Sequence, residues 1–398
     1  MVVRLHEFTH VEALVMPPYS DVIQTCPGRL LVADDQPHIL TALEMLLNNR
    51  GYQTEFAINP ISVLDALSTQ TFDVVLMDLN YTRDTTGGTE GLELVSRIRA
   101  IDQTTPLVVM TAWGNVELAV EAMRRGASDF IQKPWNNQEL LEKVREQVEI
   151  CRISRSTQRR QEEDSSEARE IQKRLLPSVI PQVAGYDIAA TTQSVHFVGG
   201  DYYDVVRIND HQTAICIADV AGKGMSGALL MSNLQAALRP LIREDIWPSE
   251  LCIRLNRILC DIMPESKFIS FFYGVLDNNK NRLTYCNAGH NPPLLLRADG
   301  STAECESSGA ILGKFPHWYY AQNDMDLAVG DTLLLFTDGV VEACNEQFEP
   351  FGEHRLLQLA QELNGSDAST LQTALLTAVS NHCGGKFQDD ATMIVLCA

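Results

Sequence analysis

The sequence predicts a multidomain chain: a doubly wound α/β domain with a five-stranded parallel sheet, then a helical linker, then an α+β domain. Two patterns predict this organisation. Up to about residue 150, short apolar segments alternate with amphipathic ones, which is typical of a parallel sheet covered by helices on both faces. From about residue 186, strand-like segments follow one another through turn residues, which favours antiparallel sheets with helices packed outside.

The N-terminal half contains five alternations of a predicted strand with a predicted helix. The strands are RLLVA, QTEF, DVVLM, LVVMT and DFIQ. In sheets of this kind, ligands bind outside the carboxyl ends of the strands. Those ends carry Asp34 and Asp35 after the first strand, Asp78 after the third, Thr111 on the fourth and Lys133 after the fifth.

The three carboxylates and the lysine at this edge indicate a magnesium site, because unpaired buried charges are too costly to serve as packing. In this interpretation Asp34 and Asp35 hold the ion. Asp78 shares the ion and attacks a phosphoryl group, and Lys133 neutralises the added charge. The alternative is that the strand ends are polar only because they reach solvent.

Over roughly residues 29–150 the sequence resembles the receiver domain of two-component response regulators. The matching features are the pair Asp34–Asp35, the motifs VVLMDLN and VVMTAWG, Phe130, and Lys133–Pro134. The resemblance implies that Asp78 accepts phosphate from a histidine kinase and that the backbone carbonyl of Asn80 completes the Mg²⁺ site. It also implies that Thr111 and Phe130 form a switch pair. The segment 81–90, YTRDTTGGTE, is longer than the loop usual in that family and lacks its proline.

The predicted boundaries follow from these patterns. They are an N-terminal extension at 1–28, the receiver domain at 29–136 with its last helix running to about 150, a helical linker at 137–180, and a second domain at 186–398. Within the linker, an apolar three-four spacing gives way to the charged segment QRRQEEDSSEARE. Two alternatives remain open here: two helices separated by a solvated hinge, or a continuous dimeric coiled coil.

The second domain contains eight strand-like segments and four longer helical ones. The strands are IAATTQ, YDVVRI, TAICIADV, FFYGVLD, RLTYCNAG, PLLLR, TLLLFTDGV and TMIVLC, and the helices cover 226–242, 249–263, 353–363 and 368–382. The segment 222–227 matches the dinucleotide fingerprint GxGxxG. A Rossmann unit requires a second parallel strand soon after its helix, whereas here the helical pattern continues to Ile262, which disfavours a dinucleotide site.

Aspartates again stand where predicted strands begin or end: Asp201 in VGGDYYD, Asp219 in IADV, Asp338 in FTDGV, and the pair Asp389–Asp390 before the last strand. One such residue would be only a turn signal. A set of oxygen ligands favours magnesium or manganese over zinc, and several carboxylates can hold two ions about 4 Å apart. The pattern therefore indicates a hydrolase that acts on phosphoryl groups.

Over about residues 186–398, together with the segment REIQKRLLP before them, the sequence resembles the metal-dependent protein serine/threonine phosphatases of the SpoIIE/RsbU type. The matching motifs are FVGGDYYDV, IADVAGKGMSGAL, FFYGVLD, NAGHNPPLLL, GAILG, GDTLLLFTDGVVEA and DDATMIVL. The resemblance implies an α/β/β/α sandwich and two Mn²⁺ or Mg²⁺ ions bridged by Asp219, with help from the carbonyl of Val220 or a neighbour. It further implies that Asp201, Asp338 and Asp389 complete the ligands, with Asp390 outside them.

Two other residues of these motifs leave alternatives open. Lys223 either meets the substrate phosphate or faces solvent in its turn. His290, in AGHNP, either has a catalytic role or makes a structural hydrogen bond that holds the turn, and the second interpretation is favoured.

Composition limits the partners. A formal net charge of -21 disfavours nucleic acid and anionic membranes as partners, and no apolar segment approaches the length of a membrane span. The 10 cysteines are scattered, which favours reduced thiols in a cytoplasmic protein. The two resemblances together imply a homodimeric response regulator that dephosphorylates phosphoserine or phosphothreonine on a protein, an anti-sigma-factor antagonist. The alternatives are a catalytically weak docking module or a receiver-linked transcription regulator.

Overall fold

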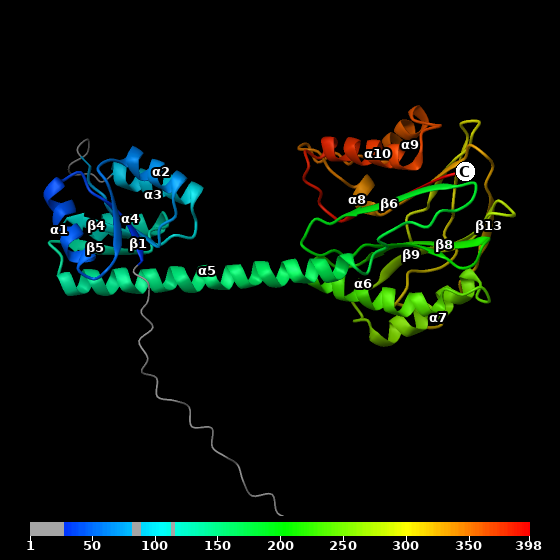
Figure 1. Ribbon diagram of the computed structural model, residues 1–398, viewed down its shortest axis with the longest axis horizontal. Coiled ribbons are helices and arrows are strands. Elements are labelled where there is room, and N and C mark those ends of the chain that lie inside the picture. Colours follow the sequence, from blue (N-terminus) through cyan, green and yellow to red (C-terminus); the bar gives the residue numbers. More distant parts are fainter. Residues whose placement is uncertain (1–27, 82–88, 113–115) are drawn as a thin grey trace, which may run out of the picture. The chain divides into compact units, whose positions relative to one another are not determined.

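The computed structural model describes residues 28–81, 89–112 and 116–398. The N-terminal extension and most of the loop at 81–90 therefore lie outside the described residues. The chain divides into two compact units, Met1–Arg160 and Gln161–Ala398 (Figure 1). No helix in the described ranges is both long and apolar enough to cross a membrane.

The first unit has a five-stranded parallel sheet, which confirms the predicted fold class. Its strand order is β2-β1-β3-β4-β5. The strands are β1 (Arg29–Ala33), β2 (Gln53–Ala57), β3 (Val74–Asp78), β4 (Leu107–Ala112) and β5 (Asp129–Lys133). The first four helices are α1 (Pro37–Asn48), α2 (Pro60–Thr69), α3 (Thr89–Ile101) and α4 (Val116–Arg124).

The central strand β3 shows why this sheet is covered on both faces. All five of its residues are buried. Val75 and Met77 pack with α2, α3 and α4, whereas Val74 and Leu76 pack with α1 and α5 (Asn137–Lys173). Because successive side chains of a strand point to opposite faces, a continuous apolar strand buries both faces and places its last residue, Asp78, at the carboxyl edge.

Helix α5 is one continuous helix of 37 residues. The alternative of two helices separated by a hinge is therefore wrong. Its first part packs into the first unit through Leu140, Val144, Val148 and Cys151, which are buried at three-four spacing. Arg155 then donates to Asp73 Oδ1 at 2.9 Å and to the carbonyl of Phe72 at 2.7 Å. These bonds hold the helix to the first unit for one turn beyond its apolar contacts.

The second unit is a four-layer α/β/β/α sandwich, as the resemblance implied. One sheet has the order β13-β10-β9-β8-β7 and the other β12-β11-β14-β15-β6. In Figure 1, α6 (Met225–Leu238) and α7 (Pro248–Ile262) cover the sheet with β8 and β9, and α9 (Glu353–Glu362) and α10 (Ala368–His382) cover the other. The strands are β6 (Asp187–Gln193), β7 (Tyr202–Arg207), β8 (Gln212–Val220), β9 (Ile269–Asp277), β10 (Arg282–Ala288), β11 (Leu294–Leu296), β12 (Thr302–Glu304), β13 (Asn323–Asp326), β14 (Thr332–Phe336) and β15 (Ala391–Cys397).

Alternation along β8 decides where its terminal carboxylate lies. Cys216 and Ala218 pack under α6 and α7, whereas Ile215 and Ile217 pack between the sheets. Asp219 has the parity of Ile215 and Ile217, so its side chain lies on the face that meets the second sheet. Strand β8 is antiparallel to both β7 and β9, and this pairing excludes a Rossmann unit at the GxGxxG segment.

Three predictions about elements need correction. The strand predicted at 332–340 ends at Phe336, and Asp338 begins a short helix, α8 (Asp338–Val341). The amide of Thr337 makes the last ladder bond, to Thr392, and the amide of Glu342 then turns back to the carbonyl of Asp338. The helix predicted at 226–242 ends in a 3₁₀ turn, Arg239–Leu241. Strands β12 and β13 were missed because they are short and mostly exposed, and so lack an apolar pattern.

Gly91 offers a test of how closely α3 must approach β3. A Cβ placed there would overlap the backbone of Leu79, the residue after Asp78. We expect Gly91→Ala to lower the stability of the first unit by about 1–3 kcal/mol through overpacking, measured as lost hydrogen-exchange protection in α3 and β3. Ser96→Ala in the same helix, where the hydroxyl only bonds the carbonyl of Leu92, is the control. Equal protection in both variants would contradict the tight contact.

Candidate functional site

The first unit brings together the charged residues that its strand ends were predicted to carry. Carboxylate oxygens of Asp34, Asp35 and Asp78 all lie within 4.8 Å of one another. Lys133 extends its ammonium group between two of them, with Nζ 2.6 Å from Asp34 Oδ2 and 2.8 Å from Asp78 Oδ2. Asp34 and Asp78 are buried, so this cluster is a dense and poorly hydrated group of charges.

The electrostatics of the cluster suit a divalent cation. Burial raises the pKa of Asp78, the Lys133 ammonium opposes this, and the nearby Asp34 carboxylate adds to it. Two buried oxygens beside the cluster, Oδ1 of Asp35 and Oδ1 of Asn80, have no hydrogen-bond partner among the described residues. Unpaired buried oxygens are costly, and hard cations such as Mg²⁺ take oxygen ligands, so the donors present fit this ion.

The two predicted switch residues lie on neighbouring strands. Thr111 is buried on β4, and Phe130 on β5 is 38% exposed. Lys143 of α5 lies against Phe130, with Nζ 5.5 Å from the ring centroid, and pairs with Asp129 Oδ1 at 2.7 Å. Lys143 and Asp129 were not predicted, because nothing in their spacing indicates that they meet. The aromatic residue is thus in direct contact with α5.

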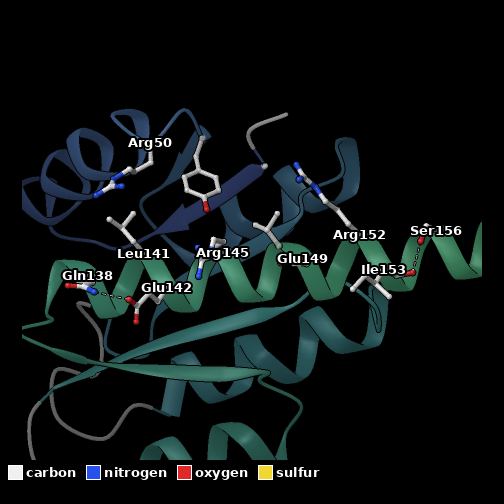
Figure 2. Close-up of a pocket in the computed structure, with 12 residues that line it drawn as sticks. Arg50, Gln138, Leu141, Glu142, Arg145, Glu149, Arg152, Ile153 and Ser156 are labelled. Carbon is white, nitrogen blue, oxygen red and sulfur yellow. Dashed lines mark hydrogen bonds between the residues drawn. The ribbon is translucent and has the colours of Figure 1, made fainter. Parts of the chain in front are cut away.

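One groove of the first unit lies away from this chemistry. Its volume is about 790 Å³, and Figure 2 shows one face of α5, with Leu141, Arg145 and Arg152, forming a wall of it. Gly28, which precedes β1, also lines it, so the groove reaches the end of the sheet opposite Asp34. None of the clustered carboxylates lines it.

In the second unit, glycines allow four aspartate-bearing segments to meet. A Cβ on Gly199 would overlap the carboxylate of Asp390, and a Cβ on Gly339 would overlap the carbonyl of Asp390. A Cβ on Gly200 would lie 2.9 Å from the carbonyl oxygen of Val220. The segments that carry Asp201, Asp219, Asp338 and Asp389 therefore approach one another at distances that only glycine permits.

Asp201 is held at the centre by hydroxyl groups. Its Oδ2 accepts hydrogen bonds from Thr337 Oγ1 at 2.8 Å and from Thr392 Oγ1 at 2.6 Å. Thr337 lies in the motif FTDGV and Thr392 in DDATM. Their spacing to Asp201 gives no sign of the contact, so neither was predicted. Thr337 follows β14 and Thr392 lies on β15, so the two threonines join Asp201 to the segments that carry Asp338 and Asp389.

The pKa values of Asp201 and Asp219 are both raised. Burial, followed by the charge of Asp219, raises the pKa of Asp201. Burial, then the charges of Asp338 and Asp389, raises the pKa of Asp219 to about 7. Carboxylates this close cannot all remain ionised without a cation beside them.

Lys223 supplies one positive charge at this site. Its Nζ lies 2.8 Å from Asp389 Oδ2 and donates to the carbonyl of Gln388 at 2.8 Å. Asp390 is engaged differently, because its two oxygens accept the backbone amides of Val195 and Gly200, each at 2.8 Å. Within the described residues, this unit does not bring three carboxylate oxygens as close together as the first unit does. Its donor set is nevertheless oxygen only, which fits magnesium or manganese.

His290 is buried beside β9. Its Nδ1 is 2.9 Å from the hydroxyl of Ser270, a residue that pairs with Asp219 across the β8–β9 ladder. Its backbone amide donates to Asn287 Oδ1 at 2.8 Å, and burial lowers the pKa of its imidazole to about 4. A neutral, buried histidine bonded in this way holds the turn.

Comparisons with known proteins identify the family of each unit. A family model described as stage II sporulation protein E (SpoIIE) matches residues 209–398, and a response regulator receiver domain model matches residues 30–145. The phosphoserine phosphatase RsbU of Bacillus subtilis is 33% identical over 230 residues, which are 58% of this chain and 68% of that protein. The chain belongs to the SpoIIE family of phosphatases.

Two further relatives support the two halves separately. Sporulation initiation phosphotransferase F of Bacillus subtilis is 30% identical over 122 residues, 31% of this chain and 94% of that protein. The PP2C domain of SiaA from Pseudomonas aeruginosa has the same fold, with a TM-score of 0.55 and 19% identity over 61% of this chain and 98% of that domain. The chain is therefore a metal-dependent protein serine/threonine phosphatase with an N-terminal receiver domain.

The raised pKa of Asp219 predicts how stability depends on pH when metal is absent. Its folded value of about 7 exceeds the ordinary 3.8, so its contribution to stability is complete below about pH 4 and is lost as the pH rises through 7. We expect the EDTA-treated protein to lose on the order of 3 kcal/mol of unfolding free energy in the phosphatase unit between pH 5 and 8.

The variant Asp219→Asn should reduce this loss, and Mn²⁺ should reverse it in the unaltered protein. Urea unfolding followed by circular dichroism measures both effects. Asp299→Asn, at an exposed turn, is the matched control and should keep the full pH dependence. An Asp219→Asn variant with the same pH dependence as the control would show that this carboxyl group keeps an ordinary pKa.

Proposed function

We propose that the protein is a response regulator whose phosphatase unit hydrolyses phosphoserine or phosphothreonine on a protein under the control of Asp78. The observation that carries this proposal is the convergence of four aspartate segments through glycine contacts, in a chain that also has a complete receiver cluster. In the reaction, water adds to phosphorus, the bond to the serine oxygen breaks, and that oxygen takes a proton. The products are inorganic phosphate and the free hydroxyl group.

In the phosphatase unit, Asp219 would be shared by two Mn²⁺ or Mg²⁺ ions, with Asp201, Asp338, Asp389 and the carbonyl of Val220 as further ligands. When bound, such ions supply hydroxide at neutral pH and offset the charge of the phosphoryl group. The remaining roles belong to the chain. Thr337 and Thr392 orient Asp201, and Asp390 fixes the segment before β7 by accepting two backbone amides.

In the receiver unit, Asp34, Asp35, Asp78 and Asn80 would hold one Mg²⁺. A cognate histidine kinase would transfer its phosphoryl group to Asp78, and Lys133 would pair with the added charge, as it already pairs with the carboxylate. The family resemblance supports a phosphorylated anti-sigma-factor antagonist as the protein substrate. It also supports a cytoplasmic homodimer, in agreement with the exposed Ile150, Ile153 and Ile171 on α5.

Helix α5 offers a route between the two sites. Near its start, Lys143 lies against Phe130, one of the two switch residues. In its last turn, Gln172 binds Gly199, donating from Nε2 to the carbonyl at 2.7 Å and accepting the amide at 3.0 Å. Gly199 stands two residues before Asp201. One continuous helix therefore contacts the predicted switch residue and the segment that carries a proposed metal ligand.

Loss of proposed ligands tests the catalytic assignment. We expect Asp219→Asn and Asp338→Asn to lower manganese-dependent cleavage of p-nitrophenyl phosphate by more than about 100-fold, because each removes a carboxylate that would hold the two metal ions. Asp299→Asn should keep full activity. Full activity in the first two variants, with unchanged circular dichroism, would rule out the two-metal assignment.

Asp78→Asn separates the two units. We expect it to abolish phosphorylation by acetyl phosphate while leaving basal cleavage of p-nitrophenyl phosphate in place, because Asp78 belongs to the receiver cluster alone. Incorporation of phosphate, followed on a Phos-tag gel, measures the first effect. A variant that is still phosphorylated would place the acceptor elsewhere.

Lys143 tests the route through α5. Beryllofluoride with Mg²⁺ mimics the phosphoryl group, and we expect it to change the phosphatase rate of the unaltered protein. In Lys143→Met the ratio of rates with and without beryllofluoride should approach one, with the basal rate retained. Arg125→Met, which removes an exposed ion pair on α4, is the control. A full response in Lys143→Met would show that the signal does not pass through this contact.

A further inference from the structure

The proposed chemistry lacks a protein cation for the substrate phosphate. Lys223 is the residue that the sequence suggests for binding the substrate phosphate. Its ammonium group, however, is paired with Asp389 and donates to the carbonyl of Gln388. Arg239, at the end of α6, is paired with the buried Asp204 at 2.7 Å. Each of these cations already neutralises a carboxylate, so neither offers an unused charge to a phosphate dianion.

Lys267 has such a charge. Its Nζ lies beside Gly222, in the turn that follows β8, and would be 2.5 Å from a Cβ placed on that glycine. In the residues that the structure describes, this ammonium group has no ion pair and no hydrogen bond. The side chain is half-buried, so its charged end is held near the turn and still meets solvent.

The backbone around Lys267 is fixed on both sides. Its amide donates to the carbonyl of Pro264 at 2.9 Å, and the amide of Ala221 donates to the carbonyl of Phe268 at 2.9 Å. The second bond extends the β8–β9 ladder, in which Val220 pairs with Ile269. Lys267 therefore lies two residues before Ile269, the ladder partner of Val220. The carbonyl of Val220 is a proposed metal ligand.

Gly222 makes room for the ammonium group and links it to the site. The residue has φ 145°, where a side chain would be strained, and its carbonyl would lie 3.1 Å from a Cβ on Gly200, the neighbour of Asp201. A cation at this turn thus stands next to the segments that carry Asp201 and Asp219. An ammonium group there would attract a phosphate that is bound to the metal ions. It would not take the place of those metal ions.

We propose that Lys267 binds the phosphate group of the phosphorylated protein and of the inorganic phosphate product. This deepens the proposed function and rests on it. The lysine acts as a point charge with three donors, which suits a phosphate whose other oxygens face the ions. It takes no part in holding the metal, so it affects binding of the anion and leaves binding of the metal as it is.

The test uses the full chain with Lys267→Gln, Lys267→Arg and Lys280→Gln. Lys280 is the matched control, because it lies beyond the opposite end of β9 and pairs with Asp277. Two quantities are measured: the affinity of the magnesium-loaded protein for inorganic phosphate, by calorimetry, and the inhibition by phosphate of p-nitrophenyl phosphate cleavage.

We expect Lys267→Gln to weaken phosphate binding about 10-fold or more and to raise KM in parallel, while the Mg²⁺ affinity stays unchanged. Lys267→Arg should restore part of the affinity, and Lys280→Gln should behave as the unaltered protein. Unchanged phosphate affinity in Lys267→Gln, or a loss explained by weaker Mg²⁺ binding, would overturn the assignment. Absence of hydrolysis in the unaltered protein would instead overturn the proposed function, and the calorimetric comparison would still decide the role of Lys267.

Discussion

Repulsion between carboxylates crowded into poorly hydrated places is the constraint on which both units depend. Ionised carboxylates at such distances raise one another's pKa, and a fold can hold them only with cations, shared protons or hydrogen bonds. In the first unit Lys133 lies between Asp34 and Asp78. In the second, burial and neighbouring carboxylates raise the pKa of Asp219, and Lys223 faces Asp389. Under the proposed function a divalent cation would complete both arrangements, and this would connect their stability to their chemistry.

The ends of buried strands place these carboxylates at defined positions. A strand buried along its length, such as β3 or β8, has a fixed register, so its last residue appears at a defined edge. Parallel pairing gathers several such ends at one edge in the first unit. In the second unit, two antiparallel sheets face each other, and threonines of one sheet reach Asp201 at the edge of the other. The same device thus serves two different folds.

The fold class and the aspartates were predictable because each depends on a local pattern. Buried strands such as VVLMD and ICIAD show a continuous apolar run and a terminal carboxylate within a few residues. The partners of these residues were not predictable. Lys143 meets Phe130, Gln172 meets Gly199 and Thr392 meets Asp201 only once the chain is folded, and no spacing in the sequence marks such pairs. The short exposed strands β12 and β13 carry no apolar signal at all.

The glycine contacts have a consequence for how this enzyme tolerates change. The aspartates can be replaced by asparagines of nearly the same shape, so catalysis can be lost by small steps that spare the fold. Gly199 and Gly339 leave no such option, because any side chain there collides with Asp390. Substitution of an aspartate can therefore remove catalysis and spare the fold, whereas substitution of Gly199 or Gly339 disturbs the packing around Asp390 itself.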